Sequence, residues 1–186
     1  MEGIILLIFF FAYIVLRLAF GMQKNQSDED RKAFARGLEA IKRQDWPFAL
    51  AYFEGAILQN PKSAVALAAR AKCHLALDEP LFAAADAEKA AAIDPYIADA
   101  YITKAKALIE LGIPEAALLE LDKAVWFDRH STEPLLLRAT LHDTANQPTK
   151  AIADLKAAAK MGDEHANFLL QRLLTKSWAE RNNKSR

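Results

Sequence analysis

The sequence predicts an all-α protein: an array of four helical hairpins, preceded by one membrane-spanning helix and followed by one capping helix. Two alanine ladders recur at every thirty-fourth position, one at Ala49, Ala83, Ala117 and Ala151 and the other at Ala56, Ala90, Ala124 and Ala158. A third ladder of small residues holds Gly37, Ala71, Ala105 and Ala139. Residues 3–22 form an apolar run with Arg17 as its only charge. The fixed period is typical of stacked helical repeats, and the apolar run is typical of a bilayer span.

Residues 1–22 are predicted to form a transmembrane anchor. An apolar helix of about 20 residues at ~1.5 Å per residue reaches roughly 30 Å, the depth of the hydrocarbon core. The long side chain of Arg17 can reach the interface from its position near the end of the run. A removable secretory signal is the alternative, because Ala19-Phe20-Gly21 offers small residues at a cleavage-like spacing. Glu2 in place of a basic start, together with Arg17 inside the apolar block, favours the retained anchor.

Residues 23–29 are predicted to be a polar linker, in which Ser27 or Asp28 can cap the first repeat helix. Arg17 and Lys24 follow most of the apolar run, whereas only the α-amine precedes it. Because flanking cations tend to stay on the cytoplasmic side, we expect a single-pass membrane protein whose repeat domain faces the cytoplasm.

Four repeat units are predicted within residues 30–165, with the ranges 30–63, 64–97, 98–131 and 132–165. In the third unit, apolar residues follow helical spacing from Tyr101 to Leu111, stop at Gly112-Ile113-Pro114 and resume from Ala117. Proline begins the second helix at Pro80, Pro114 and Pro148, with Pro47 one position after the matching point of the period. Proline suits the first turn of a helix because the amides there have no partner within the helix.

A capping helix is predicted over residues 164–178. Gly162 can end the preceding helix, and Asp163 can cap the new one. Its apolar stripe contains Ala166, Leu169, Leu170, Leu173 and Leu174. Residues 179–186 form a basic tail, for which an anionic partner surface and a solvated, frayed end are both open interpretations.

This organisation resembles the tetratricopeptide repeat (TPR), a helix-turn-helix of about 34 residues with small residues in each helix and a proline near its end. The sequence departs from the family pattern in places. The large aromatic late in the second helix is present as Phe53 but is replaced by Ala87, Leu121 and Leu155. The terminal proline is present as Pro61 and Pro95 but is replaced by Arg129 and Asp163. The resemblance implies a right-handed superhelix whose first helices line a concave, partner-binding groove.

The groove residues that the resemblance implies are Phe34, Leu38, Lys72, Ile102, Thr103, Lys106, Leu137 and Thr140. Such a groove is mainly apolar with two ammonium groups, which suits a helix or extended peptide carrying a carboxylate. Packing between helices is the alternative for Ala68, Ala69 and Leu136. The chaperone-binding carboxylate clamp of some TPR domains needs Lys, Asn, Asn, Lys and Arg. The corresponding positions here hold Phe34, Leu38, Ala69, Asp99 and Thr103, so the clamp is absent.

Composition and motifs argue against other classes of function. The 24 basic and 24 acidic side chains balance, which gives no overall attraction to nucleic acid. Cys73 is the only cysteine and is expected to be a buried thiol. The sequence shows no catalytic motif, no metal-ligand set and no cofactor motif. Glu110, Glu115 and Glu120 are expected on solvated helix faces.

We therefore expect a membrane-tethered adaptor or assembly factor that binds a protein partner, and no enzyme. One alternative is an exported accessory or chaperone-like factor with a cleaved leader. The other is a self-associating scaffold that uses Trp126 and Phe127 as an exposed aromatic patch, although these side chains could instead fill space between the third and fourth units.

Overall fold

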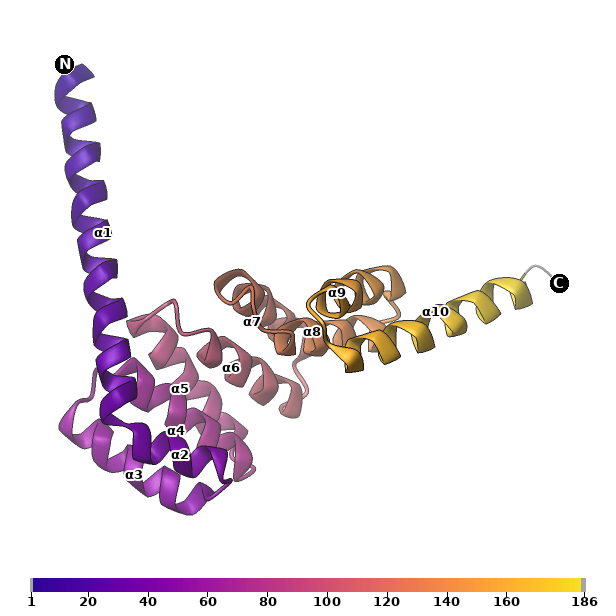
Figure 1. Ribbon diagram of the computed structural model, residues 1–186, viewed down its shortest axis with the longest axis horizontal. Coiled ribbons are helices and arrows are strands. Elements are labelled where there is room, and N and C mark those ends of the chain that lie inside the picture. The colour runs from indigo at the N-terminus through magenta and orange to yellow at the C-terminus, as the bar shows by residue number, and fades with distance from the viewer. Residues whose placement is uncertain (1, 185–186) are drawn as a thin grey trace. The chain divides into compact units, whose positions relative to one another are not determined.

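The structure, a computed structural model, describes the backbone of residues 2–184 and the side chains of residues 7–15, 17–18 and 26–176. Over that range the chain forms α-helices and no strand, which confirms the all-α prediction (Figure 1). It divides into two compact units, Met1–Ala100 and Tyr101–Arg186, with the boundary inside α6.

The helices pair into hairpins along the chain. The first unit contains α1 (Glu2–Ala33), α2 (Ala35–Lys42), α3 (Trp46–Gln59), α4 (Ala64–Ala76) and α5 (Pro80–Ile93). Then follow α6 (Ala98–Glu110), α7 (Pro114–Phe127), α8 (Glu133–Thr144), α9 (Pro148–Lys160) and α10 (Glu164–Lys184). The pairs α2–α3, α4–α5, α6–α7 and α8–α9 each fall within one of the four predicted repeat ranges.

The turn inside each hairpin recurs in the same register. Pro80, Pro114 and Pro148 are the first residues of α5, α7 and α9, as predicted. Two positions before each of these prolines, and at the matching position of the first hairpin, the backbone adopts positive φ. These residues are Gln44, Asp78, Gly112 and Asn146, and only one of them is a glycine. A residue in the left-handed region ends the first helix and lets the second begin at once.

The small-residue ladders lie where the helices pack most closely. Ala49, Ala83, Ala117 and Ala151 are completely buried, and so are Ala90, Ala124 and Ala158. Ala71, Ala105 and Ala139 are also buried. A methyl group at these positions lets neighbouring backbones approach where a larger side chain would hold them apart. The residues of the three ladders thus occupy packing positions between the helices.

The first hairpin has an aromatic core. Phe53 is fully buried, and its ring lies edge-on to Tyr52 and Phe34, with centroids 5.4 and 6.1 Å away. A Cβ at Gly37 would lie 2.4 Å from Cδ1 of Tyr52 and 2.8 Å from Cζ of Phe53. The third ladder therefore needs glycine in this hairpin, whereas alanine fits in the others.

The three later hairpins share an ion pair between a buried carboxylate and a partly buried cation, whose members are 16 residues apart in the sequence. The pairs are Arg70 Nε to Asp86 Oδ2 at 2.6 Å, Lys104 Nζ to Glu120 Oε1 at 2.9 Å, and Arg138 Nη2 to Asp154 Oδ1 at 2.6 Å. The hydrogen bond to Asp86 raises the pKa of Arg70, and that to Asp154 raises the pKa of Arg138.

The acidic residues expected on solvated faces divide into two groups. Glu110 and Glu115 are exposed, as expected. The expectation for Glu120 is wrong, because its carboxylate is buried between Lys104 and Lys123.

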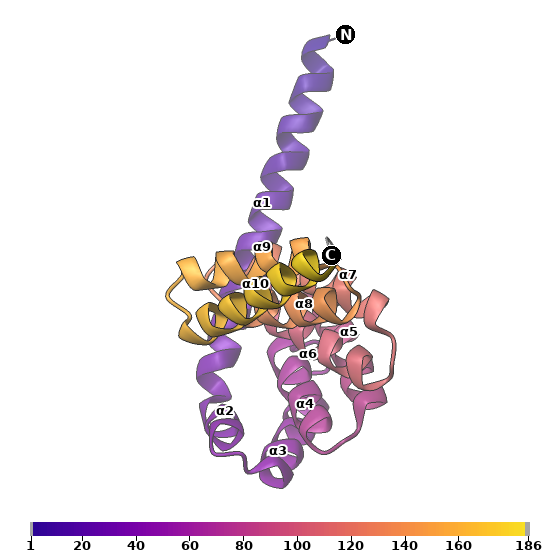
Figure 2. The same cartoon turned by 90° about the vertical axis from the view of Figure 1, so that its right-hand side faces the viewer.

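α10 covers the end of the second unit, as predicted, and lies along α9 (Figure 2). Gly162 has φ +92 after α9, and the Ala166 amide donates to Asp163 Oδ1 at 2.9 Å, which caps α10. Ala166, Leu170 and Leu173 are buried against α8 and α9. The helix continues to Lys184, beyond the predicted end at residue 178. The side chains of the predicted basic tail lie outside the described residues.

α1 runs unbroken to Ala33, so the predicted linker of residues 23–29 is helical. The expectation that Ser27 or Asp28 caps the first repeat helix is wrong. The helix passes through both residues, and α2 begins after Phe34 with no side-chain cap.

The apolar part of α1 is exposed over most of its described side chains. Across the described residues, no helix offers a stretch with both the length and the apolar character that a membrane crossing requires. The side chains of residues 3–6, 16 and 19–22 of the expected span lie outside the described set.

Candidate peptide-binding groove

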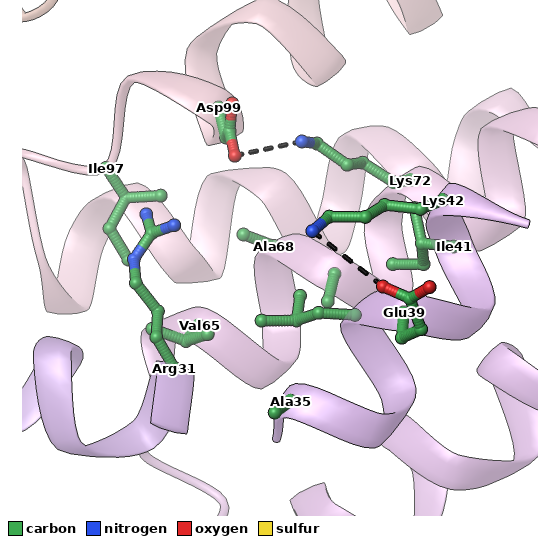
Figure 3. Close-up of a pocket in the computed structure, with 12 residues that line it drawn as sticks. Arg31, Ala35, Glu39, Ile41, Lys42, Val65, Ala68, Lys72, Ile97 and Asp99 are labelled. Atoms are coloured by element: carbon green, nitrogen blue, oxygen red, sulfur yellow. Dashed lines mark ion pairs between the residues drawn. The ribbon is translucent and has the colours of Figure 1, made fainter. Parts of the chain in front are cut away.

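A cavity of about 490 Å³ opens in the first unit, on the face formed by the first helices of the first two hairpins (Figure 3). Its lining comprises Arg31, Ala35, Leu38, Glu39, Ile41, Lys42, Val65, Ala68, Ala69, Lys72, Ile97 and Asp99. We call this cavity the groove. Val65, Ala68 and Ala69 give it an apolar floor, because the first half of α4 presents small or branched apolar side chains with little exposure.

Charged side chains surround this apolar floor. Lys72 Nζ lies 2.8 Å from Asp99 Oδ2, and Lys42 Nζ lies 3.8 Å from Glu39 Oε2. Figure 3 shows the Arg31 side chain extending beside Ile97, on the opposite side of the cavity from the two lysines. Lys72 and Lys42 therefore each have a carboxylate partner within the lining.

The end of α1 is fastened to the hairpins beside the groove. The Ser27 hydroxyl donates to Asp94 Oδ2 at 2.5 Å, and the Ser63 hydroxyl donates to the buried carboxylate of Asp30. Ser63 also accepts from the Ala66 amide at 3.2 Å and so caps α4. The same hydroxyl thus connects α1 to the helix that forms the groove floor.

Three of the predicted groove residues belong to the first unit. Leu38 and Lys72 line the groove. Phe34 does not line it, and its ring packs against Phe53 in the core of the first hairpin. Two of these three residues therefore line the cavity.

The other five predicted groove residues belong to the second unit. Ile102 and Thr103 are buried, and Leu137 packs on a buried cluster that includes Leu121. Lys106 Nζ lies 2.5 Å from Glu133 Oε1. Thr140 is exposed and lines a smaller cavity of about 230 Å³, together with Asp143, Arg172 and Lys176.

Sequence reasoning missed the acidic partners and Arg31. Asp99 pairs with Lys72 from the following hairpin, and Arg31 precedes Phe34, the first position to which the resemblance assigns a groove residue. The ion pairs within hairpins could have been predicted from the 34-residue period, because their members recur at that spacing. Arg70, Lys104 and Arg138 form one ladder, and Asp86, Glu120 and Asp154 form another.

The other residues singled out from the sequence, Trp126, Phe127 and Cys73, do not lie together in one site. Trp126 is 68% exposed with the Arg129 guanidinium 5.0 Å from its ring centroid, whereas Phe127 stacks on Tyr101 at 5.4 Å. Cys73 is a free, buried thiol, as expected, and burial raises its pKa to about 11. In the described part of the chain no three His, Cys, Asp or Glu side chains converge as metal ligands would.

Comparison with known proteins identifies the fold. No family model matches the chain, and no curated protein matches it. Among solved structures, Pseudomonas aeruginosa PilF is 22% identical with a TM-score of 0.73, over 82% of this chain and 71% of that one. A thermophilic TPR protein of Thermus thermophilus is 22% identical with a TM-score of 0.67, over 83% and 82% of the two chains.

A third solved structure, the TPR protein YrrB, is 17% identical with a TM-score of 0.61, over 76% of this chain and 74% of its own. At these identities the likeness shows the fold alone. The TPR fold expected from the alanine ladders is confirmed.

Proposed function

We propose that this protein is a membrane-tethered adaptor that binds a peptide or helix of a partner protein in the groove. The observation that carries the proposal is the groove itself, with its apolar floor of Val65, Ala68 and Ala69 inside a charged rim. Apolar side chains of a peptide gain free energy by leaving water for such a floor, and polar groups at the rim fix their orientation.

The TPR fold supports this proposal. Arrays of helical hairpins present extended surfaces for binding. YrrB is a TPR protein with an unusual peptide-binding site. The proposed occupant of the groove in this chain is likewise a protein segment.

The membrane tether is supported by the surface of α1. Five consecutive side chains, from Leu7 to Phe11, are each at least 60% exposed. Consecutive residues point around the whole circumference of a helix, so this exposed apolar surface is not one face awaiting a neighbouring helix. A bilayer covers such a surface on every side. The basic residues Arg17 and Lys24 favour a cytoplasmic location for the hairpins.

A direct test combines membrane extraction with crosslinking of the full chain in native membranes. We expect the chain to remain in the pellet after carbonate extraction, and a variant lacking residues 3–22 to be released. For the groove, a photo-crosslinking residue at Ala35 reports capture of protein segments. Lys72→Glu combined with Leu38→Glu should reduce that capture about tenfold, because it places two carboxylates at the apolar floor.

Leu58→Glu is the matched control, because Leu58 is 85% exposed on α3 and does not line the groove. Equal capture by the groove variant and this control would show that the groove does not bind the partner. Release of the intact chain by carbonate would contradict the tether.

A further inference from the structure

We propose that α1 is a rigid strut that holds the groove close to the bilayer and supplies its anion-binding group, Arg31. The occupant is then an acidic juxtamembrane segment of another membrane protein. This inference rests on the proposed function, and it adds the chemistry of the partner and the distance of its binding segment from the membrane.

α1 is continuous from its apolar segment to the groove. The helix runs from the apolar segment to Ala33 without a break, and Arg31 follows Met22 by nine positions. At ~1.5 Å per residue, this segment spans roughly 14 Å. The bonds from Ser27 to Asp94 and from Ser63 to Asp30 fasten its last turns to the hairpins. The apolar segment and the groove are thus joined without a flexible linker.

The cations around the groove differ in whether they have a carboxylate partner. Lys72 and Lys42 are paired with Asp99 and Glu39 inside the lining. Arg31 makes no ion pair with any described side chain, and its guanidinium extends into the cavity region beside Ile97 (Figure 3). The planar fork of a guanidinium matches a carboxylate through two parallel hydrogen bonds. Charge complementarity therefore selects an occupant that brings a carboxylate to Arg31 and apolar side chains to the floor.

The groove lies within reach of a short segment of a partner anchored in the same bilayer. A partner chain leaving the same bilayer covers roughly 14 Å in about four extended residues. A segment held so near the membrane is presented to the groove at a high effective concentration, whereas a long flexible spacer dilutes it. The fixed height therefore favours an acidic residue a few positions after the partner's own span.

The test uses the full chain in nanodiscs of uncharged lipid, with a photo-crosslinking residue at Ala35. The probe is a pool of lipid-anchored, eight-residue peptides of Leu, Ala and Glu, and the matched pool has Gln in place of Glu. We expect half-saturation of crosslinking at about tenfold lower density for the Glu pool, the size of one charge-assisted hydrogen bond. Arg31→Gln should abolish this difference. Lys32→Gln should preserve it, because Lys32 is exposed on the same turn and does not line the groove.

A second arm tests the strut. A spacer of about 20 Gly and Ser residues between lipid and peptide should lower capture severalfold by dilution. Inserting Gly-Gly-Ser-Gly-Gly-Ser between Lys24 and Asn25 should remove that preference for the short attachment. If the chain with the insertion still captures the spacer-free peptide better, the proposal that α1 holds the groove at a fixed distance from the bilayer is wrong.

The outcomes separate this inference from the proposed function. Equal capture of the Glu and Gln pools by the parent chain would overturn the role of Arg31 while leaving a peptide-binding groove. Failure of both pools to crosslink, with the chain retained in the disc, would contradict the groove proposal itself. Arg31-dependent crosslinking to added phosphatidylserine in place of peptide would identify a lipid headgroup as the ligand and overturn the peptide inference.

Discussion

Within the shared repeat register, the first hairpin places Arg36 and Tyr52 where the later hairpins place a partly buried ion pair. The Arg36 guanidinium lies 5.2 Å from the centroid of the Phe48 ring, and the Tyr52 ring packs on Phe53. The corresponding pairs in the later hairpins are Arg70–Asp86, Lys104–Glu120 and Arg138–Asp154. The backbone period is therefore compatible with either a cation–π contact or an ion pair between the two helices of a hairpin.

The difference extends to the neighbouring positions. The rings of Tyr52 and Phe53 in the first hairpin require Gly37 opposite them, whereas Ala87 in the second hairpin leaves room for Ala71. Side-chain volume in one helix is thus compensated in the other. The repeat keeps the helices close together and varies the side chains that hold them there.

The largest expected effect comes from breaking one of the ion pairs. Arg138→Met should lower the free energy of unfolding by about 3 kcal/mol, because it leaves the buried carboxylate of Asp154 without its partner. Arg36→Met, the matched change in the first hairpin, should cost less than about 1 kcal/mol, since it removes only an exposed cation–π contact. Denaturant titration of the full chain in detergent, followed by circular dichroism, measures both.

The double variant Arg138→Met with Asp154→Leu controls for the loss of charge. It should recover most of the stability, because it removes the buried charge together with its partner. Equal costs for Arg138→Met and Arg36→Met would abolish the distinction between the hairpins.

Cys73 and Glu39 occupy equivalent positions of the second and first hairpins, 34 residues apart, and differ in burial. Cys73 is buried, whereas Glu39 is exposed. Burial raises the pKa of the Cys73 thiol to about 11, from an ordinary value of 9.0. At pH 8 its alkylation should be roughly a hundredfold slower than that of an unfolded thiol, because only the thiolate reacts. Mass spectrometry after iodoacetamide treatment gives the rates.

Glu39→Cys in a Cys73→Ala background is the matched thiol and should react at nearly the unfolded rate.

The raised pKa of Cys73 also has a consequence for the free energy of unfolding. The contribution of Cys73 is complete below pH 9 and is lost as the pH rises towards 11, since the unfolded chain then gains more from ionisation. Cys73→Ala should lack this pH-dependent component, and rapid alkylation of native Cys73 would contradict its burial.

The smallest of these effects concerns glycine in the first hairpin. Gly37→Ala should destabilise the protein by about 2 kcal/mol, because the new Cβ overlaps the rings of Tyr52 and Phe53. Gly55→Ala on α3 meets no atom within 4 Å and should stabilise the helix by about 0.5–1 kcal/mol. Thermal unfolding followed by circular dichroism compares the two. A stabilising Gly37→Ala would show that the first hairpin has the same spare volume as the others.

The ladders made the hairpins predictable because close helix packing tolerates only small side chains. The same packing position recurs once in every hairpin, so these small residues repeat every 34 positions. The ion pairs escaped prediction although Arg70 and Asp86 lie on regular ladders. Their separation of 16 residues acquires meaning only when the facing sides of two helices are known. A charged residue such as Glu120 is therefore predicted to face solvent, because the sequence does not show which residue it pairs with.

The end of α1 could not be read from local sequence for a different reason. Residues 23–29 are polar, a composition that suits either a linker or a solvated helix. The contacts of Ser27 and Asp30 with residues 67 and 33 positions away hold this segment against the hairpins. Such long-range bonds leave no periodic signal, so the groove's Arg31 was missed along with them.

The shared hydroxyl of Ser63 has a mechanical consequence. It accepts from the amide of Ala66 and donates to Asp30, so a pull along α1 acts directly on the first turn of α4, while the bond from Ser27 to Asp94 carries load to the end of α5. If α1 is anchored in a bilayer as proposed, membrane tension would reach the helix that forms the groove floor. A segment held in the groove would then be released by force while the alanine-lined hairpins stay folded.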